Sequence, residues 1–164
     1  MKVGILTVSD KGARGEREDR SGPAIREMIE AVGGEIVRTK IVPDEREDIR
    51  ASLLAWSEEG LDLVLTTGGT GFSPRDWTPE ATKGVIEREA PGLGEAMRRA
   101  GAEKTPTAML SRAVAGIRGS TLIINLPGSE KAVRESLAVL LPALPHAVDI
   151  LRGTASECAG RRHD

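Results

Sequence analysis

Aromatic residues and cysteine are nearly missing from this sequence. Its 164 residues include two tryptophans, one phenylalanine, no tyrosine and a single cysteine, Cys158. Proteins that bind single-stranded nucleic acid usually stack the bases on aromatic rings, so the composition argues against that class. One cysteine and two distant histidines, His146 and His163, allow neither an internal disulfide nor a zinc site of the Cys/His type. We therefore expect a protein of the reducing cytoplasm.

A strong charge of either sign and a long apolar run are also missing. The formal net charge is −2 and the pI is about 5.8, so the chain offers no basic surface of the kind that binds DNA or RNA. The apolar run at residues 3–8 is too short for a signal peptide or for a membrane span of about 20 residues. We expect neither nucleic acid nor a membrane among its partners.

Five apolar runs predict β-strands. They cover residues 3–8, 35–42, 61–67, 113–117 and 122–126, with a turn through 118–120 between the last two. Strand patterns alternate with helical patterns, which predicts an α/β fold: a three-layer α/β/α sandwich around a mostly parallel, doubly wound sheet. No linker or repeat interrupts residues 1–153, so we expect a single domain there. Residues 154–164 are predicted to form a polar, flexible tail.

Helical periodicity and capping residues mark the segments between these strands. Apolar residues of 25–32 fall on one helix face, and the glycine pair after them marks its end. Asp44 and Glu47 have the spacing of a capping box, which predicts a helix N-terminus at Asp44. Thr78 predicts another N-cap, and residues 92–101 a further helix. The apolar stripe of 133–151 predicts a last helix that Pro142 and Pro145 kink or split.

Three polar or glycine-rich segments follow the predicted strands: residues 9–21, 68–78 and 127–129. Ligands of open α/β sheets bind beyond the carboxyl ends of the strands, so Ser9, Pro127 and Gly128 are candidate binding residues. Residues 68–71, Gly-Gly-Thr-Gly, let the backbone approach an anion and predict a phosphate-binding loop. A simple tight turn would use the same glycines.

The glycine loop is of neither common nucleotide-binding type. The chain has no Gly-Lys-Ser/Thr, which excludes a P-loop, and Pro74 stands where the dinucleotide fingerprint needs its third glycine. Asp76 follows the loop, and a carboxylate beside bound phosphate implies a cation such as Mg²⁺ between them. Arg75 is a candidate to neutralise phosphate charge. Asp76 is equally explained by a hydrogen bond to its own loop.

Seven short runs together resemble one family, the molybdopterin adenylyltransferases, including the bacterial single-domain enzymes and the G domain of gephyrin. The runs are LTVSD (6–10), DRSGP (19–23), TGGTGF (67–72), PRD (74–76), TPEAT (78–82), MLSR (109–112) and INLPG (124–128). They extend over about residues 2–151, in order and with ordinary spacing. Each run alone is common, whereas seven in register are specific to the family.

The resemblance implies an enzyme of molybdenum cofactor biosynthesis that joins the terminal phosphate of molybdopterin to the α-phosphate of ATP and releases pyrophosphate. It assigns the two essential aspartates to Asp44 and Asp76, as catalytic residues and Mg²⁺ ligands. The substrate and nucleotide would contact the loop residues Gly68, Gly69, Thr70 and Gly71, and the substrate-side serine Ser111. The resemblance also implies a homotrimer and a downstream molybdate-insertion enzyme as a partner.

Three features depart from the family, and one alternative function stays open. Trp77 stands where relatives usually carry a small aliphatic residue, Glu130 where proline is common, and residues 11–18 are unusually charged. Molybdate-insertion enzymes and competence-damage proteins share the fold but are much longer chains. A non-catalytic molybdopterin-binding or scaffolding module of the same fold is the main alternative, and it would have no need of two aspartates in the site.

Overall fold

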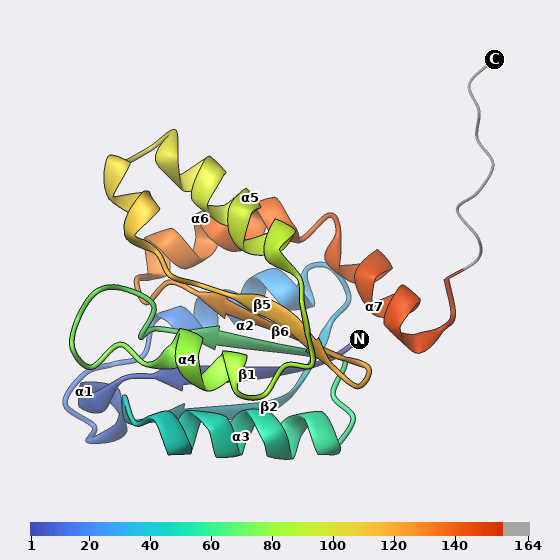
Figure 1. The fold of residues 1–164 in the computed structure, drawn as a ribbon, viewed down its shortest axis with the longest axis horizontal. Coiled ribbons are helices and arrows are strands. Elements are labelled where there is room, and N and C mark those ends of the chain that lie inside the picture. Colours follow the sequence, from blue (N-terminus) through green and yellow to red (C-terminus); the bar gives the residue numbers. More distant parts are fainter. Residues whose placement is uncertain (156–164) are drawn as a thin grey trace.

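A six-stranded sheet runs through the middle of the computed structural model, which describes residues 1–155. Most of the predicted tail, from residue 156 onward, lies outside the described residues. The strand order is β2-β1-β3-β6-β5-β4 (Figure 1). The four parallel strands are β2 (Glu35–Val42), β1 (Lys2–Val8), β3 (Leu63–Thr67) and β6 (Thr121–Leu126). β5 (Ala115–Arg118) and β4 (Arg88–Glu89) are antiparallel and complete one edge.

Helices cover both faces of this sheet and make it the middle of three layers. One face packs against α2 (Ser21–Glu30), α5 (Pro91–Ala102), α6 (Glu130–Leu140) and α7 (Leu144–Arg152). The other face packs against α3 (Arg46–Glu58) and α4 (Thr78–Lys83). Figure 1 shows α3 below the sheet, α4 in front of the strands, and α5 and α6 above the sheet. The predicted three-layer α/β/α sandwich around a mostly parallel sheet is therefore confirmed.

Alternating side chains of the central strands supply the two cores. In β1, Val3 and Ile5 face the α2 side, whereas Leu6 and Val8 face the α3 side. Because helix layers cover both faces of these strands, the strands read as mostly apolar runs. Their buried polar residues are threonines and Asn125 in β6, which is fully buried and donates to the hydroxyls of Thr66 (3.0 Å) and Thr82 (2.8 Å). These hydrogen bonds join β6, β3 and α4.

Some helix boundaries differ from the sequence-based predictions. α2 ends at Glu30, and Val32 lies beyond it with 39% of its surface exposed. The helix ends early because Gly33 takes a left-handed φ of 79° and the N–H of Gly34 turns back to the carbonyl of Ile29 (2.9 Å). The last predicted helix is split as expected, since α6 ends at Leu140 and α7 begins at Leu144.

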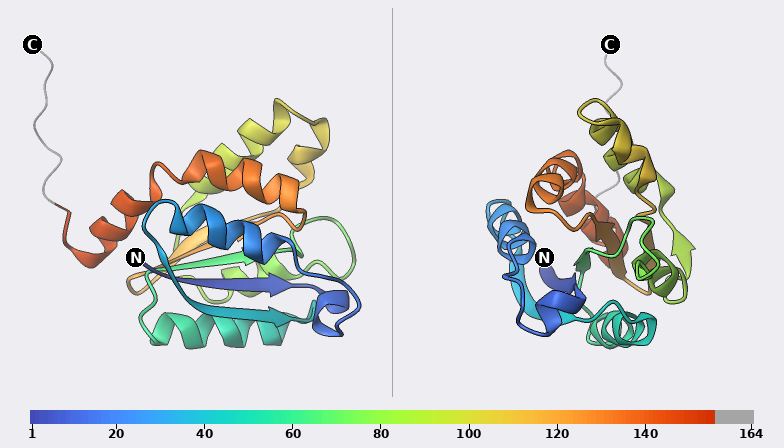
Figure 2. Two further views of the ribbon diagram at one scale, coloured as in Figure 1. Left: turned by 180° about the vertical axis from the view of Figure 1, so that it is seen from behind. Right: turned by 90° about the vertical axis from the view of Figure 1, so that its left-hand side faces the viewer.

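Two short helices carry no periodic signal, and the sequence did not predict them. They are α1 (Asp10–Ala13) and the 3₁₀ helix η1 (Pro106–Leu110). α1 begins where β1 ends, and the hydroxyl of Ser9 caps it by accepting the N–H of Gly12 (3.0 Å). Figure 2, seen from behind, shows α1 beside the arrowheads of the parallel strands. The segments that follow β1, β2, β3 and β6 therefore meet at this one edge.

Candidate active site

A cavity of about 760 Å³ opens at the edge where the four parallel strands end. Its lining comes from segments that follow each of these strands. The lining residues are Thr7, Val8, Ser9, Gly12, Arg17, Glu18, Asp19, Arg20, Ser21, Asp44, Thr67, Gly68, Gly69, Asp76, Gly128, Ser129 and Glu130. Of the residues predicted from the sequence, the structure thus brings together Ser9, Asp44, Gly68, Gly69, Asp76 and Gly128.

The glycine loop can exist only without side chains at its first two positions. Gly68 and Gly69 have φ values of 97° and 65°, which side chains disfavour. A Cβ on Gly68 would lie 2.3 Å from the carbonyl oxygen of Val8, and one on Gly69 would lie 2.4 Å from the hydroxyl of Thr78. That hydroxyl donates to the carbonyl of Gly68 (2.9 Å), so Thr78 holds the loop rather than capping α4, whose N-cap is Trp77.

Three successive N–H groups of this loop have no hydrogen-bond partner within residues 1–155. The hydrogen bonds among residues 1–155 include none donated by the backbone N–H of Gly69, Thr70 or Gly71. The carbonyls of the same segment are engaged: that of Gly69 accepts the N–H of Thr78 (3.1 Å), and that of Thr70 accepts the N–H of Arg112 (2.8 Å). Free N–H groups in a loop with positive φ angles form a concavity suited to phosphate oxygens.

Asp44 is held by the end of β1 and not by the helix that follows it. The capping-box prediction is wrong, because α3 begins at Arg46 with Glu45 as its N-cap and no side-chain cap. Instead, the Asp44 carboxylate accepts the N–H of Asp10 (2.7 Å), and the Asp10 carboxylate accepts the N–H of Asp44 (2.9 Å). A Cβ added to Gly69 would lie 3.4 Å from Asp44 Oδ1, so the carboxylate is next to the glycine loop.

The charge of Asp44 is destabilised by its surroundings. Burial raises the pKa of its carboxyl, and the negative charges of Asp10 and Asp76 raise it further. The hydrogen bond from the N–H of Asp10 and the charge of Arg75 oppose this rise without cancelling it. Asp44 is therefore an acid surrounded by acids at the rim of a cavity, which is a favourable position for a cation.

Asp76 faces the same cavity from a tight turn. Its Oδ2 accepts the N–H of Ser73 (2.9 Å), and its own N–H donates to the carbonyl of Ser73 (2.9 Å). The loop-structural role considered for Asp76 is therefore present, and it occupies only one carboxylate oxygen. Oδ2 also lies 3.0 Å from the position of a Cβ on Gly71, so the glycine leaves room for the carboxylate.

Arg75 does not line the cavity. Its guanidinium binds Asp10 with two hydrogen bonds (3.0 and 2.9 Å) and Glu45 with a third (2.8 Å). The hydrogen bonds from Arg75 are the main reason that the pKa of Asp10 lies below its usual range. Cavity-lining cations are instead Arg17 and Arg20, in the charged loop after α1, which sequence reasoning left unassigned.

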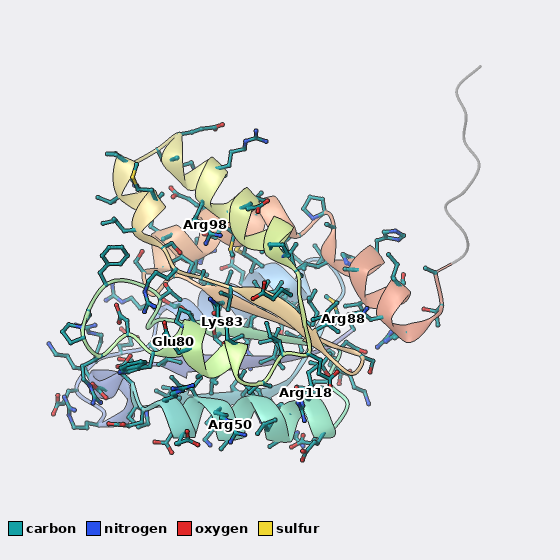
Figure 3. The ribbon with its side chains drawn as sticks, in the orientation of Figure 1. Arg50, Glu80, Lys83, Arg88, Arg98 and Arg118 are labelled. Carbon is teal, nitrogen blue, oxygen red and sulfur yellow. The ribbon has the colours of Figure 1, made fainter. Side chains whose placement is uncertain are left out.

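Ser111 and Pro127 line a second, smaller cavity of about 220 Å³ between α5, η1 and α6. Gly128, the next residue, lines the first cavity, so the backbone at 127–128 lies between the two. The carbonyl of Ser111 accepts a hydrogen bond from Arg98 on α5 (3.3 Å; Figure 3). Thr70 and Gly71 line neither of these cavities, although both belong to the glycine loop.

Arg112 is the main anchor of the glycine loop, and sequence reasoning did not single it out. Its guanidinium donates to the carbonyl of Gly71 (2.8 Å), to the carbonyl of Asp76 (2.7 Å) and to the carboxylate of Glu80. Glu80 lies on α4 (Figure 3). One side chain thus fixes both ends of the segment that carries Asp76. The sequence signal that could have identified Arg112 was its place in the run MLSR, one of the seven runs that resemble the family.

Asp19 and Ser21 are also at the site, from the run DRSGP. Asp19 lies one residue before Arg20, the N-cap of α2. Its carboxylate accepts the first two N–H groups of that helix, from Ser21 (3.1 Å) and Gly22 (3.0 Å), and the hydroxyl of Thr7 (2.8 Å). The hydroxyl of Ser21 donates to the carbonyl of Gly128 (2.8 Å). The N-terminus of α2, the end of β1 and the loop after β6 are therefore joined into one wall of the cavity.

The family model described as "Probable molybdopterin binding domain" matches residues 4–146 of this chain. The chain is 47% identical to the molybdopterin adenylyltransferase of Helicobacter pylori (strain J99) over 156 residues, which cover 93% of this chain and 89% of that protein. It is 44% identical to gephyrin of Dictyostelium discoideum, where the match covers 98% of this chain but only 24% of gephyrin.

A solved structure has the same fold. The crystal structure of the molybdopterin biosynthesis enzyme MoaB from Thermus thermophilus superposes with a TM-score of 0.89 at 57% sequence identity. The match covers 93% of this chain and 96% of that one. This chain therefore spans nearly all of the two bacterial relatives and about a quarter of gephyrin.

Proposed function

We infer the function from the family: this chain belongs to the family of molybdopterin binding domains, and we propose that it transfers the adenylyl group of ATP to molybdopterin. A terminal phosphate oxygen of molybdopterin attacks the α-phosphorus of ATP and forms a new P–O bond. The bond from the α-phosphorus to the bridging oxygen breaks, and pyrophosphate leaves. This is the reaction named for the Helicobacter pylori relative, and it needs no side-chain nucleophile.

The observation that carries this proposal is the meeting of two carboxylates and the glycine loop at one cavity. Gly68 and Gly69 line this cavity, and the next two residues of the loop also have free N–H groups. The N–H groups of residues 69–71 suit the oxygens of a phosphate chain. Asp44 and Asp76 line the same cavity, where carboxylates alone would repel phosphate. We propose that they orient the pyrophosphate leaving group through a cation. Catalysis then consists of positioning and charge neutralisation, as is usual for phosphoryl-type transfer.

The residues present fit magnesium. Mg²⁺ is typically bound by one or two carboxylates together with substrate phosphates and water, and Asp44 and Asp76 supply two carboxylates. Among residues 1–155, no three or more His, Cys, Asp or Glu residues gather into a metal site, so we expect the ion to bind with the nucleotide. When bound, it would supply positive charge against the phosphates. That positive charge would stabilise the ionised form of Asp44, whose pKa is raised partly by Asp76.

The other predicted residues have supporting places in this scheme. We propose that Ser9, Gly68, Gly69 and Gly128 contact the phosphate chain, since all four line the cavity. Thr70 and Gly71 would contribute backbone N–H groups, and Ser111 and Pro127 would contact molybdopterin from the second cavity. For Arg75 we now propose that it holds Asp10 in place, because its guanidinium is bound to Asp10 and Glu45.

The assembly and the partners are proposals of the same kind. We propose a homotrimer, for which the exposed apolar side chains Val139 on α6 and Ile150 on α7 offer contact surface, and a molybdate-insertion enzyme that takes up the product. We place the reaction in the cytoplasm because a single cysteine suits a reducing compartment. Within residues 1–155, no helix is long and apolar enough to cross a membrane.

The test is direct adenylyl transfer. The protein is incubated with molybdopterin and ATP labelled at the α-phosphate, with and without Mg²⁺, and the product is separated by chromatography. We expect Mg²⁺-dependent transfer of label to molybdopterin with release of pyrophosphate, and its loss in Asp76→Asn. A protein that binds molybdopterin but transfers no label would be the non-catalytic binding or scaffolding module, and the proposed function would be wrong.

A further inference from the structure

Two of the three aromatic residues of this chain are exposed on one short loop. Trp56 is in the core between β1 and α3, as expected for a large apolar side chain. Phe72 and Trp77, in contrast, have 69% and 42% of their surfaces exposed, and both lie in the segment between the glycine loop and α4. Neither residue belongs to either of the two hydrophobic cores. Exposed aromatic groups beside a cavity indicate a binding surface.

These two rings line a separate cavity, which we call the aromatic pocket. It has a volume of about 410 Å³, and its lining includes Phe72, Pro74, Asp76, Trp77, Glu80 and Arg112. Asp76 also lines the site cavity, so the two cavities adjoin at this residue. A ligand whose phosphates bind beside Asp76 can therefore extend its other end into the aromatic pocket.

The charges at the wall of the aromatic pocket favour a neutral occupant. Glu80 and Arg112 are paired with each other, and the guanidinium of Arg112 is further occupied by the carbonyls of Gly71 and Asp76. No free cation of residues 1–155 lines the aromatic pocket for an anionic group. The other charged group of the lining is the carboxylate of Asp76, where the pocket adjoins the site cavity. The rest of the lining is largely the apolar surface of two aromatic rings and a proline, which suits a flat, uncharged ring system.

We propose that the aromatic pocket binds the purine base of the nucleotide, by stacking on Trp77 with Phe72 and Pro74 beside it. This inference rests on the proposed function, in which the phosphates of the same nucleotide bind beside Asp76. Stacking on an aromatic ring accepts any base but favours the larger purine rings. Trp77 stands where a small aliphatic residue is expected. By stacking on the base, this tryptophan would increase the affinity for the nucleotide.

The fluorescence of Trp77 also allows base binding to be measured. Mg-ATP is titrated into the wild-type protein and into Trp77→Leu while tryptophan fluorescence and, independently, heat of binding are recorded. We expect Mg-ATP to change the fluorescence of the wild type, with no such change in Trp77→Leu because Trp56 is buried in the core. Trp77→Leu should weaken ATP binding by about 5- to 100-fold, and Phe72→Ala by a smaller factor in the same direction.

Three controls separate the base from the phosphates. Mg-tripolyphosphate has no base, so its affinity should be the same for the wild type and Trp77→Leu. GTP should behave like ATP, whereas CTP should bind more weakly to the wild type and lose less in Trp77→Leu. Val32→Ala removes an apolar side chain beyond the end of α2, which has 39% of its surface exposed and lines neither cavity, and should leave ATP affinity unchanged.

Four results would overturn the inference. Equal ATP affinity of the wild type and Trp77→Leu, with adenylyl transfer intact, would leave the proposed function standing and remove the base from this pocket. A fluorescence change with a free pterin but none with ATP would assign the pocket to the other substrate. A change with protein concentration alone would assign it to a contact between subunits. Failure of the wild type to bind ATP at all would remove the proposed function and this inference together.

Discussion

Asp10 and Asp44 hold each other by a reciprocal pair of hydrogen bonds, each carboxylate accepting the backbone N–H of the other residue at 2.7 and 2.9 Å. The pair joins the segments after β1 and β2 at the mouth of the cavity. The surroundings shift the pKa values of the two carboxyl groups in opposite directions. Arg75 lowers the pKa of Asp10, whereas burial and the neighbouring acids raise that of Asp44. Asp44 is thus fixed in place at a cost in electrostatic energy.

The first prediction is that Asp44→Asn makes the protein more stable and inactive. An asparagine oxygen can still accept the N–H of Asp10, while the repulsion from Asp10 and Asp76 disappears. We expect the free energy of unfolding at pH 7 to rise by up to about 1 kcal/mol, which is about 2–4 °C in Tm for a chain of this size. Adenylyl transfer should fall by about 100-fold or more. Thermal melts and the transfer assay measure both effects.

Lowering the pH gives this first prediction a second test. The folded-state pKa of Asp44 is raised, so between the unfolded and the folded pKa the native state holds more protons and stability falls as the pH rises. The advantage of Asp44→Asn should therefore shrink as the pH falls through the folded pKa of Asp44, and wild-type activity should fall in the same range. Asp48→Asn, on the exposed start of α3, should not stabilise. Destabilisation by Asp44→Asn at pH 7 would contradict the prediction.

A second prediction concerns Gly71, whose missing side chain leaves space for the Asp76 carboxylate. A Cβ at Gly71 would lie 3.0 Å from Oδ2 of Asp76, and its φ is not in the left-handed region. Gly71→Ala should therefore displace the carboxylate and lower kcat/KM by about 10- to 100-fold, with a stability change below about 1 kcal/mol. Gly92→Ala, where a Cβ meets nothing within 4 Å, is the control. Equal turnover in both variants would mean that the Asp76 position is not critical.

A third prediction concerns Arg112, the anchor of the loop. Lysine cannot reproduce three hydrogen bonds from one planar group, so Arg112→Lys should free the segment between Gly71 and Asp76. We expect KM for Mg-ATP to rise and kcat to fall, together by about 10-fold or more in kcat/KM. Arg118→Lys is the control, because Arg118 donates to the carbonyl of Val85 away from the site (3.0 Å; Figure 3).

A purely structural role for Arg112 would lower the Tm of Arg112→Lys without changing the kinetics of the molecules that remain folded. Kinetics measured well below the Tm therefore decide between the two roles. A variant that melts early yet keeps the wild-type KM for Mg-ATP would show that Arg112 supports the fold alone.

The fourth prediction concerns stability away from the site, at Asp62 and Arg152. Burial would raise the pKa of Asp62, but hydrogen bonds from Arg152 and from the N–H of Lys2 outweigh burial and hold it below its usual range. Arg152→Met should cost about 1.5–3 kcal/mol, because it removes the charged partner of the nearly buried carboxylate and leaves it only the N–H of Lys2. Arg50→Met, at the exposed pair with Glu47 (3.7 Å), should cost below about 0.5 kcal/mol.

The pH dependence of this fourth effect has a definite sign. A depressed folded-state pKa gives stability that is present above the unfolded pKa of about 4 and is lost as the pH falls through the folded value. Urea unfolding should therefore show the difference between the wild type and Arg152→Met at pH 7 and a smaller one near pH 3. A constant difference across this range would mean that packing of α7, and not the charge of Asp62, anchors the C-terminal helix.

Local patterns predicted most of the fold. Strand β2 has the predicted bounds, and the hairpin of β5 and β6 turns at the predicted glycine. Pro142 and Pro145 separate α6 from α7 because neither residue can donate a helical hydrogen bond. The four residues of α1 and the two of β4 could not be predicted, since elements so short show no period. The Asp44 cap failed because a competing donor, the N–H of Asp10, takes the carboxylate.

The sequence by itself determined the layers of this protein and the edge at which its site lies, because strand and helix periodicity and the glycine turns depend on near neighbours in the chain. Only the tertiary structure decided the partners of the site residues. Asp10 is 34 residues from Asp44 and 65 from Arg75, and Arg112 is 41 from Gly71. Such pairs form only after parallel strands align their ends, since the register of the sheet sets which side chains meet across it.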